Sequence, residues 1–276
     1  MSAAICAVVV TRDRLALLKQ CVEALRGQTR PPDRILVLDN ASSDGTAEWL
    51  AAQDGVETLR LEENGGGAGG FHAGLERAHA EGAEWVWLMD DDTIPRPGAL
   101  EALLRPETDA ILRASVAVWK DGRLHPMNVP GLERDRIEPL VAAAPERVLP
   151  LRTATFVSLL VHREAVKRFG LPEARYFIWS DDIEYTARVT RGGGSAVLVP
   201  DSVVEHRTAK PYTAVTSAGE RFYYHARNTL YMVRGRSWSP LEKVSLLYLL
   251  VLTSLQYVRA GGSPGVVLRG LRDGVR

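Results

Sequence analysis

The sequence predicts an α/β protein with a mixed, mostly parallel sheet flanked by helices. Two observations carry this prediction: short apolar, β-branched runs alternate with segments of helical spacing through residues 4–89, and polar residues gather where those runs end. Apolar residues make up 46% of the 276-residue chain, enough to bury a substantial core. Ligands of such sheets bind beyond the carboxyl ends of the strands, so we expect a Rossmann-like nucleotide-binding half.

The first half of the chain supports the prediction element by element. Leu15, Leu18 and Val22 recur at helical spacing between two apolar runs, which is the pattern of a β-α-β unit. The segment Ser42 to Asp44 offers caps for a second helix. The expected strands cover residues 4–10, 35–38, 56–61 and 85–89, and the expected helices cover residues 14–26, 46–52 and 71–81.

The second half is less regular, and no internal repeat is evident. After Asp92 the alternation of strands and helices weakens, and residues 138–150 are rich in Ala and Pro, which is typical of a loop. The expected elements are a hairpin of residues 111–119 and 123–129 around Lys120 to Gly122, a loop over 138–150, a strand over 154–161, a helix over 181–191, and a strand over 196–199 that leads to His206.

The C-terminal tail, residues 236–276, differs in composition from the part before it, residues 1–235. Residues 244–258 are apolar nearly all round, but 15 residues are short of the roughly 20 that span a bilayer. From Arg234 to Arg276 seven basic residues face two acidic ones, a net charge of +5. The segment is therefore expected to be a helix that is either buried in a core or bound at an anionic membrane surface.

Charge and cysteine content exclude some classes of function. The formal net charge is zero, which argues against nucleic-acid binding by the molecule as a whole. Cys6 and Cys21 form no metal or redox motif and are expected to be buried thiols. The N-terminus lacks a charged segment of the secretory type, so a cytoplasmic location is expected, with the inner face of the plasma membrane as an attachment site for the tail.

A run of three aspartates, Asp90 to Asp92, follows the apolar strand at 85–89. Adjacent carboxylates repel one another unless a cation neutralises them, so the run predicts a divalent-metal site. A glycine-rich segment, Asn64 to Gly70, precedes it and contains the dinucleotide-binding spacing at Gly65, Gly67 and Gly70. That spacing follows the third strand instead of the first, so it indicates backbone contact with a diphosphate or sugar more than NAD binding.

A second acidic pair, Asp181 and Asp182, lies beside the aromatic residues Tyr176 and Trp179. These aspartates are expected to complement the dipole of the following helix or, in an aromatic-lined pocket, to act as a general base with a raised pKa. His206 would complete a set compatible with Mn²⁺ beside a carboxylate pair. Asp39 is expected either to contact a base or ribose or to begin the turn before its helix.

Together these segments resemble the inverting family 2 glycosyltransferases with the GT-A fold, over about residues 4–235. The glycine-rich segment and the pattern Tyr223-Tyr-His-Ala-Arg-Asn228 look most like the branch that contains galactofuranosyl- and rhamnosyltransferases of actinobacterial cell-wall assembly. The residues that carry the resemblance are Val8 to Arg14, Leu38 to Thr46, Asn64 to Gly70, Trp87 to Asp92, Trp179 to Tyr185 and Tyr223 to Asn228.

The resemblance implies a transfer of sugar from a nucleoside-diphosphate sugar to a glycan or lipid-linked glycan hydroxyl. An NAD-dependent oxidoreductase and a catalytically silent module with the same fold remain as alternatives. By the resemblance, the donor would contact Thr11, Arg12, Asp39, Asn64, Gly66, Gly69, Asp90 and Asp91; Mn²⁺ or Mg²⁺ would bind Asp90, Asp92 and His206; Asp182 or, as second choice, Asp181 would be the base; and Tyr176 and Trp179 would face the acceptor.

Overall fold

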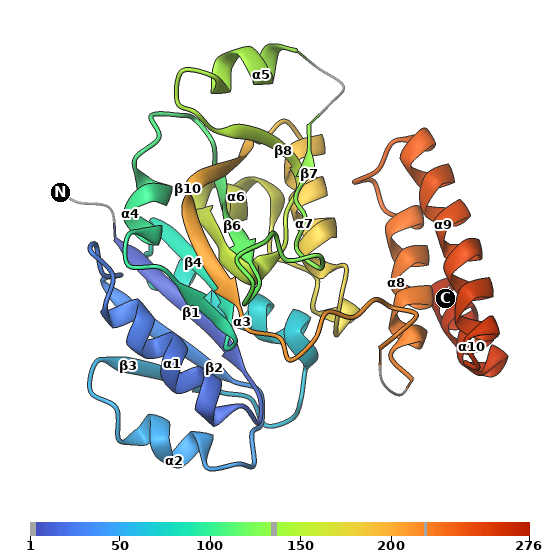
Figure 1. The fold of residues 1–276 in the computed structure, drawn as a ribbon, viewed down its shortest axis with the longest axis horizontal. Coiled ribbons are helices and arrows are strands. Elements are labelled where there is room, and N and C mark those ends of the chain that lie inside the picture. The colour runs from blue at the N-terminus through green and yellow to red at the C-terminus, as the bar shows by residue number, and fades with distance from the viewer. Residues whose placement is uncertain (1–3, 134–136, 218–219) are drawn as a thin grey trace.

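A computed structural model describes residues 4–133, 137–217 and 220–276 (Figure 1). Its strands are β1 (Ile5–Thr11), β2 (Arg34–Asp39), β3 (Val56–Arg60), β4 (Trp85–Asp90), β5 (Thr93–Pro95), β6 (Leu112–Val118), β7 (Gly131–Leu132), β8 (Leu149–Thr153), β9 (Leu159–His162) and β10 (Ala196–His206). They form one sheet in the order β3-β2-β1-β4-β9-β6-β10-β8-β7, with β5 paired to β10. The mixed α/β prediction is confirmed.

Helices cover both faces of this sheet. One face carries α1, α2 and α4, and the other carries α3, α6 and α7. The helices are α1 (Leu15–Arg26), α2 (Thr46–Ala51), α3 (Gly66–Ala80), α4 (Ala99–Leu104), α5 (Glu138–Ala143), α6 (Arg163–Phe169), α7 (Asp181–Arg191), α8 (Phe222–Arg234), α9 (Pro240–Arg259) and α10 (Pro264–Gly274), with short 3₁₀ turns η1 (Phe156–Ser158) and η2 (Ala174–Tyr176).

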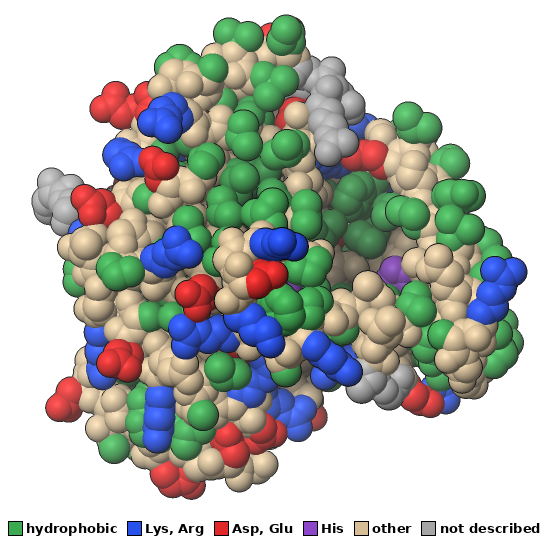
Figure 2. All heavy atoms as spheres, in the orientation of Figure 1, with side chains coloured by type: hydrophobic (Ala, Val, Ile, Leu, Met, Phe, Trp, Pro, Cys, Tyr) green, Lys and Arg blue, Asp and Glu red, His purple; other side chains and the backbone are tan. Residues whose placement is uncertain are grey.

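The helices α8, α9 and α10 stand beside the sheet as a C-terminal unit with its own small core. Phe222 of α8 stacks on Tyr257 of α9 with ring centroids 4.2 Å apart. The packing of α8 on both later helices crosses the predicted boundary at residue 235, and that boundary stays a prediction. Figure 2 shows apolar side chains along the outer edge of this unit.

Helix α9 corrects the expectation for the apolar segment in two ways. It has 20 residues, begins with a capping box of Ser239 and Glu242, and is long and apolar enough to cross a membrane by length and composition alone. It is also largely open: only Leu250 and Tyr257 are buried, whereas Tyr248 is 63% exposed. The core-helix alternative is therefore wrong for the described chain.

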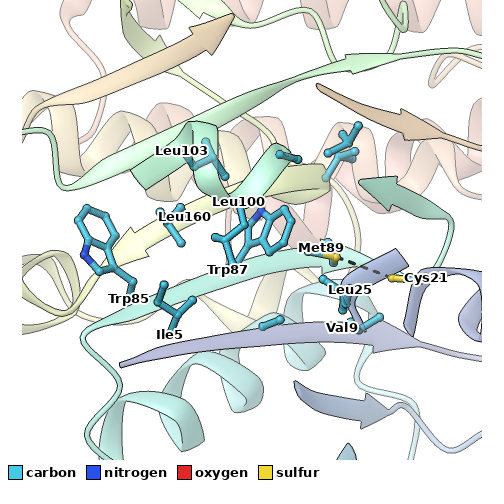
Figure 3. Packing of buried hydrophobic residues seen from close by; sticks show 14 of the residues in the cluster. Ile5, Val9, Cys21, Leu25, Trp85, Trp87, Met89, Leu100, Leu103 and Leu160 are labelled. Carbon is cyan, nitrogen blue, oxygen red and sulfur yellow. Dashed lines mark hydrogen bonds between the residues drawn. The ribbon is translucent and has the colours of Figure 1, made fainter. Parts of the chain in front are cut away.

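The strands alternate their side chains between two cores, as a sheet covered on both faces requires. In β1, Ala7 and Val9 face the α1 side and Val8 faces the α3 side. Figure 3 shows Trp87 at the centre of the α1-side core, with Cys21 close to Met89. Both cysteines are free and buried, as expected.

The four N-terminal strands are all parallel, in agreement with the predicted alternation of strands and helices. The second half mixes directions, because β9 runs antiparallel to both β4 and β6, while β10 is parallel to β6. Strand β10 also continues beyond the expected residues 196–199 to His206. This extension carries His206 to the edge where β4 ends.

Helix α3 begins five residues earlier than expected, so most of the glycine-rich segment is helical and not a loop. Glycine normally disfavours a helix, but here it permits close packing on the sheet. A Cβ atom at Gly70 would lie 2.5 Å from Val10 Cγ1, and one at Gly74 would lie 2.5 Å from Val8 Cγ1. Close approach to β1 therefore selects glycine at these helical positions.

Three further expectations in the second half need correction. The hairpin keeps one isolated bridge, Val118 to Leu124, and residues 123–129 form no strand. The expected loop over 138–150 contains α5 and the start of β8. The strand expected over 154–161 is divided between η1 and β9, since the chain must turn before it can pair with β4. The prediction of no secretory signal involves residues 1–3, which lie outside the described residues.

Candidate functional site

The carboxyl ends of β1, β2 and β4 meet at one edge of the sheet, beside a cavity of about 830 Å³. The parallel register fixes this meeting, because Thr11 pairs with Asp39 and Val10 pairs with Asp90. The predicted site residues that line the cavity are Thr11, Arg12, Asn64, Gly66, Asp90, Asp91, Asp92, Trp179, Asp181, Asp182 and His206.

Asp39, Gly69 and Tyr176 do not line this cavity. Asp39 is fully buried, where its Oδ1 accepts the Ser42 N–H at 2.9 Å, as the turn interpretation expects. Its Oδ2 has no hydrogen-bond partner among the described residues and lies 3.3 Å from Arg60 Nη1. Tyr176 is buried edge-on against Tyr231, away from the opening.

Asp90, Asp92 and His206 form a compact set whose potential ligand atoms lie within 4.8 Å of one another. His206 Nδ1 is 2.7 Å from Asn128 Oδ1, an acceptor, so we assign the proton to Nδ1 and a lone pair to Nε2. That lone pair faces Asp92 Oδ1 at 3.2 Å, and this oxygen has no hydrogen-bond partner among the described residues. His206 Nε2 and Asp92 Oδ1 are both electron-rich, and at this separation they could bind one cation together. The carboxylate ligands suit Mg²⁺ or Mn²⁺.

Arg14 neutralises part of the aspartate run from the opposite side. Its Nη1 lies 2.6 Å from Asp92 Oδ2 and 3.4 Å from Asp91 Oδ1. Burial opposes ionisation of Asp92, but the hydrogen bond and charge of His206 in its protonated form, together with Arg14, outweigh burial and hold the pKa of Asp92 below its ordinary value. Burial and then the neighbouring carboxylates raise the pKa of Asp90 well above its ordinary value.

Asp91 is hydrogen-bonded within the protein and does not belong to the metal-type set of Asp90, Asp92 and His206. The Thr11 hydroxyl donates to Asp91 Oδ2 at 2.8 Å, and the Arg12 N–H donates to the same oxygen at 3.4 Å. Burial raises the pKa of Asp91 to about 6. These bonds join the ends of β1 and β4, so the middle aspartate of the run holds the edge in shape.

The entry to α3 is fixed by a network of amides. Asn40 Oδ1 accepts the Gly65 N–H and its Nδ2 donates to the Gly66 carbonyl, both at 2.8 Å. Asn64 Oδ1 accepts the Gly66 N–H at 3.0 Å. Gly66 has φ of 70°, and a Cβ atom there would lie 1.9 Å from the Phe177 carbonyl oxygen. This position therefore requires glycine for conformation and for space.

Asp181 and Asp182 begin α7 and line the same cavity as the strand ends. Burial raises the pKa of Asp182 to about 6, and burial followed by the charge of Asp182 raises that of Asp181 well above its ordinary value. Burial and the charge of its neighbour thus oppose ionisation most strongly at Asp181, so Asp182 is the member of the pair that more readily carries the negative charge. An ionised carboxylate with a raised pKa can accept a proton from a substrate hydroxyl.

The backbone just before this pair is strained. Phe177, Trp179 and Ser180 have φ values of 63°, 65° and 69°, in the left-handed region that non-glycine residues rarely occupy. Each such residue costs on the order of 1–3 kcal/mol and persists only where its surroundings enforce it. The segment also directs Trp179 into the cavity wall beside Asp182.

The roles predicted from the sequence left out Arg14, Asn40 and Asn128, which the structure places in contact with predicted site residues. Asn40 directly follows β2 and Arg14 lies three residues beyond the end of β1, so their position at the ligand-binding edge was a usable signal. Asn128 offered no local signal, because it reaches His206 from an irregular segment 78 residues away in sequence.

Comparisons with known proteins agree with this geometry. Residues 6–114 match the family described as Glycosyl transferase family 2. The chain is 33% identical over 202 residues to the galactofuranosyltransferase GlfT1 of Mycobacterium tuberculosis, which covers 70% of this chain. It spans 66% of that relative, just under two thirds of its length.

Two further proteins are similar. The N-acetylglucosaminyl-diphospho-decaprenol L-rhamnosyltransferase of Mycobacterium tuberculosis is 26% identical over 226 residues, covering 70% of this chain and 72% of the relative. The crystal structure of GalNAc-T7 with UDP, GalNAc and Mn²⁺ superposes with a TM-score of 0.62 at 14% identity, covering 83% of this chain and 48% of that one. The likeness to the GalNAc-T7 structure shows a shared fold.

Proposed function

The chain carries a glycosyl transferase family 2 domain, and from this premise we propose that it moves a sugar from a nucleoside-diphosphate sugar to a hydroxyl of a glycan or lipid-linked glycan. The observation that carries the proposal is the meeting of two acidic groups across one cavity. Asp90, Asp92 and His206 form one wall, and Asp181 with Asp182 forms the other. Neither an oxidoreductase nor a silent module requires both groups.

The wall formed by the strand ends, which we call the donor wall, is proposed to bind the donor. Asp90, Asp92 and His206 would hold Mn²⁺ or Mg²⁺, which supplies positive charge for the departing diphosphate. Arg12 and Asn64 line the cavity on either side of the strand ends, and Gly66 brings backbone close to the opening. Thr11 and Asp91, which line the cavity, are proposed to contact the donor, whereas Asp39 and Gly69, which do not line it, would act in donor binding through the residues beside them.

The wall formed by Trp179 and the start of α7, which we call the acceptor wall, is proposed to carry the base. Asp182 accepts the proton of the acceptor hydroxyl as that oxygen forms a bond to the anomeric carbon, and the bond from this carbon to the diphosphate oxygen breaks. The nucleoside diphosphate leaves with the bonding electron pair. A single displacement with one base inverts the anomeric configuration and needs no covalent enzyme intermediate.

The names of the relatives guide the choice of sugar. Galactofuranosyl and rhamnosyl transfer point to UDP-galactofuranose or dTDP-rhamnose as donors, and an acceptor with a diphospho-decaprenol group in one relative points to a lipid-linked glycan. Trp179 offers an apolar face in the cavity wall on which a sugar ring of the acceptor can pack. Tyr176 would support that wall from behind.

We extend the proposal to an anionic lipid surface as the partner of α9. Tyr248, Val251 and Leu255 are 63%, 58% and 50% exposed at helical spacing, so one face of the helix is open and apolar. The tail, residues 236–276, has six basic and two acidic residues, and this net charge of +4 suits acidic headgroups. Such binding would hold the protein at the cytoplasmic face of the plasma membrane, next to a lipid-linked acceptor.

A donor screen by mass spectrometry tests the activity. We expect release of UDP or dTDP from one sugar nucleotide in the presence of Mn²⁺, and loss of that release in Asp182→Asn. Thermal protection by UDP or dTDP with Mn²⁺ is expected in both proteins. Protection by NAD without metal, together with no sugar transfer from any donor, would instead favour an oxidoreductase.

Cosedimentation with phosphatidylglycerol vesicles tests the membrane face. Wild-type protein should bind these vesicles, bind phosphatidylcholine vesicles weakly, and lose binding when Tyr248 and Val251 are both changed to Ser. Val141→Ser, at an equally exposed position of α5, is the matched control and should bind normally. Equal sedimentation of both variants, or a dimer that only the α9 variant disrupts, would reject the lipid assignment.

A further inference from the structure

Five successive carbonyl groups before the acidic pair are held by other parts of the chain. They belong to Arg175 through Trp179, the segment that contains two of the left-handed residues. Their hydrogen-bond donors come from α3 and from α8, which lie far apart in sequence. A strained segment with this many outside contacts has its conformation imposed by its surroundings.

Asn228 of α8 makes most of these contacts with one amide group. Its Nδ2 donates to the carbonyls of Tyr176 at 3.0 Å, Ile178 at 2.8 Å and Trp179 at 3.0 Å. Asn228 is fully buried, and Arg227 Nε donates to its Oδ1 at 3.0 Å, which fixes the orientation of the amide. A single side chain thus gathers three carbonyls of an irregular turn.

Arg227 holds the carbonyls at the start of the segment in the same way. Its Nη2 donates to the carbonyls of Arg175 at 2.9 Å and Tyr176 at 2.8 Å. The guanidinium lies over the rings of Tyr223, Tyr224 and Tyr231 at 5.0–5.4 Å, and these rings restrict its position. The residue is a fixed donor and not a loose surface charge.

The segment Arg175 to Trp179 also contacts the start of α3, beside the donor wall. The Ala68 N–H at the start of α3 donates to the Phe177 carbonyl at 3.1 Å, directly against Gly66. The Phe177 ring stacks on Tyr224 of α8 with centroids 5.0 Å apart. The segment is therefore clamped between the helix that borders the donor and a helix of the C-terminal unit.

We propose that Arg227 and Asn228 are positioning residues for the acceptor wall, so that α8 of the C-terminal unit completes the active site. By holding the left-handed turn at Trp179 and Ser180, they set the direction of Trp179 and the start of α7, where Asp182 lies. Neither residue lines the cavity, so their effect falls on the acceptor wall and on transfer. The proposal rests on the proposed function for its catalytic part.

The test compares Asn228→Ala and Asn228→Asp with Arg234→Met. Asn228→Asp keeps the size of the side chain but replaces the donating amide group with an oxygen that repels the carbonyls. Arg234 is the matched control, because it lies on the same helix and donates to the Gly274 carbonyl at 3.1 Å, away from the cavity. Arg227→Met is the second variant and Arg227→Lys its conservative rescue.

We expect both Asn228 variants to lower kcat about 10- to 100-fold, as small misplacements of catalytic groups do, with the donor KM and the Mn²⁺-dependent thermal shift by UDP unchanged. Backbone hydrogen exchange in residues 174–182 should become faster by at least about tenfold. Arg227→Met should do the same to a smaller extent, Arg227→Lys should recover part of kcat, and Arg234→Met should change neither quantity.

Unchanged kcat and unchanged exchange in the Asn228 and Arg227→Met variants would overturn the proposal. So would a loss of donor binding and thermal stability equal to the loss of transfer, because that pattern describes general unfolding. If the wild-type protein transfers no sugar, the exchange measurement still decides whether the clamp exists, and the proposed function fails separately.

Discussion

The two walls of the cavity present similar carboxyl groups on very different backbones. The donor wall consists of strand ends, where parallel pairing sets the positions of Thr11 and Asp90. The acceptor wall consists of a turn with left-handed residues, and side chains of other helices hold it in place. Regular hydrogen bonding fixes the first wall, and a few long-range contacts fix the second.

This difference teaches where the site is robust. A substitution on the donor wall removes one group but leaves the sheet that holds its neighbours. A substitution near the acceptor wall can release several groups at once, because Asn228 alone holds the carbonyls of Tyr176, Ile178 and Trp179. Substitutions can therefore change one wall without the other, or change the contact that joins the two walls.

The largest expected effect is on the acceptor wall. Asp182→Asn should lower kcat by about 10²- to 10⁴-fold, the range that a general base contributes, while UDP with Mn²⁺ still protects the protein thermally. Steady-state kinetics and thermal shift measure the two outcomes. Equal loss of transfer and donor protection would contradict the assignment of Asp182 as base.

The contact between the walls is tested by Gly66→Ala. A Cβ atom at this left-handed position would meet the Phe177 carbonyl, and we expect a loss of roughly 2–4 kcal/mol in the free energy of unfolding in urea. Gly67→Ala is the control, since nothing lies within 4 Å of its added Cβ. That variant should be neutral or stabilised by up to about 1 kcal/mol, and equal losses in both would refute the contact.

The donor wall is tested by dividing the aspartate run. Asp92→Asn should abolish the Mn²⁺-dependent part of UDP stabilisation, which is about 2.7 kcal/mol at a hundredfold excess over Kd. Asp91→Asn should retain it, because Asp91 binds Thr11 and not the metal-type set. The reverse result would show that the run is oriented differently.

The smallest effect concerns pH. The pKa of Asp182 is raised to about 6, so the base is ionised above this pH and kcat should fall as pH decreases through 6. Holding the ionised form in the folded state costs stability above pH 6, and this cost disappears as pH falls toward 4. Asp182→Asn should therefore raise the free energy of unfolding at pH 7 and flatten its pH dependence.

Chemical denaturation at pH 7 and at pH 5 measures this stability difference. The control is Asp201→Asn, which removes a carboxylate whose side chain is 53% exposed and lies far from the cavity lining. That substitution should change stability little at either pH. A pH dependence that survives in Asp182→Asn would assign the titration to another group.

Side chains of both walls could be predicted from the sequence, but the backbone that holds the acceptor wall could not. An apolar run followed by Asp90 to Asp92 is a local pattern, and parallel topology then brings the strand ends together. The left-handed turn before Asp181 has no glycine to announce it, and its donors are in other helices. Contacts such as Arg14 with Asp92, 78 residues apart, follow only from the assembled sheet.

The clamped carbonyls also limit how the chain can be redesigned. Because five consecutive backbone positions from Arg175 to Trp179 each meet a fixed donor, one inserted or deleted residue would shift all of them out of register. Side-chain changes at Ile178 or Trp179 leave these backbone bonds intact. Libraries that seek new acceptors should therefore vary residue identity within this turn and keep its length constant.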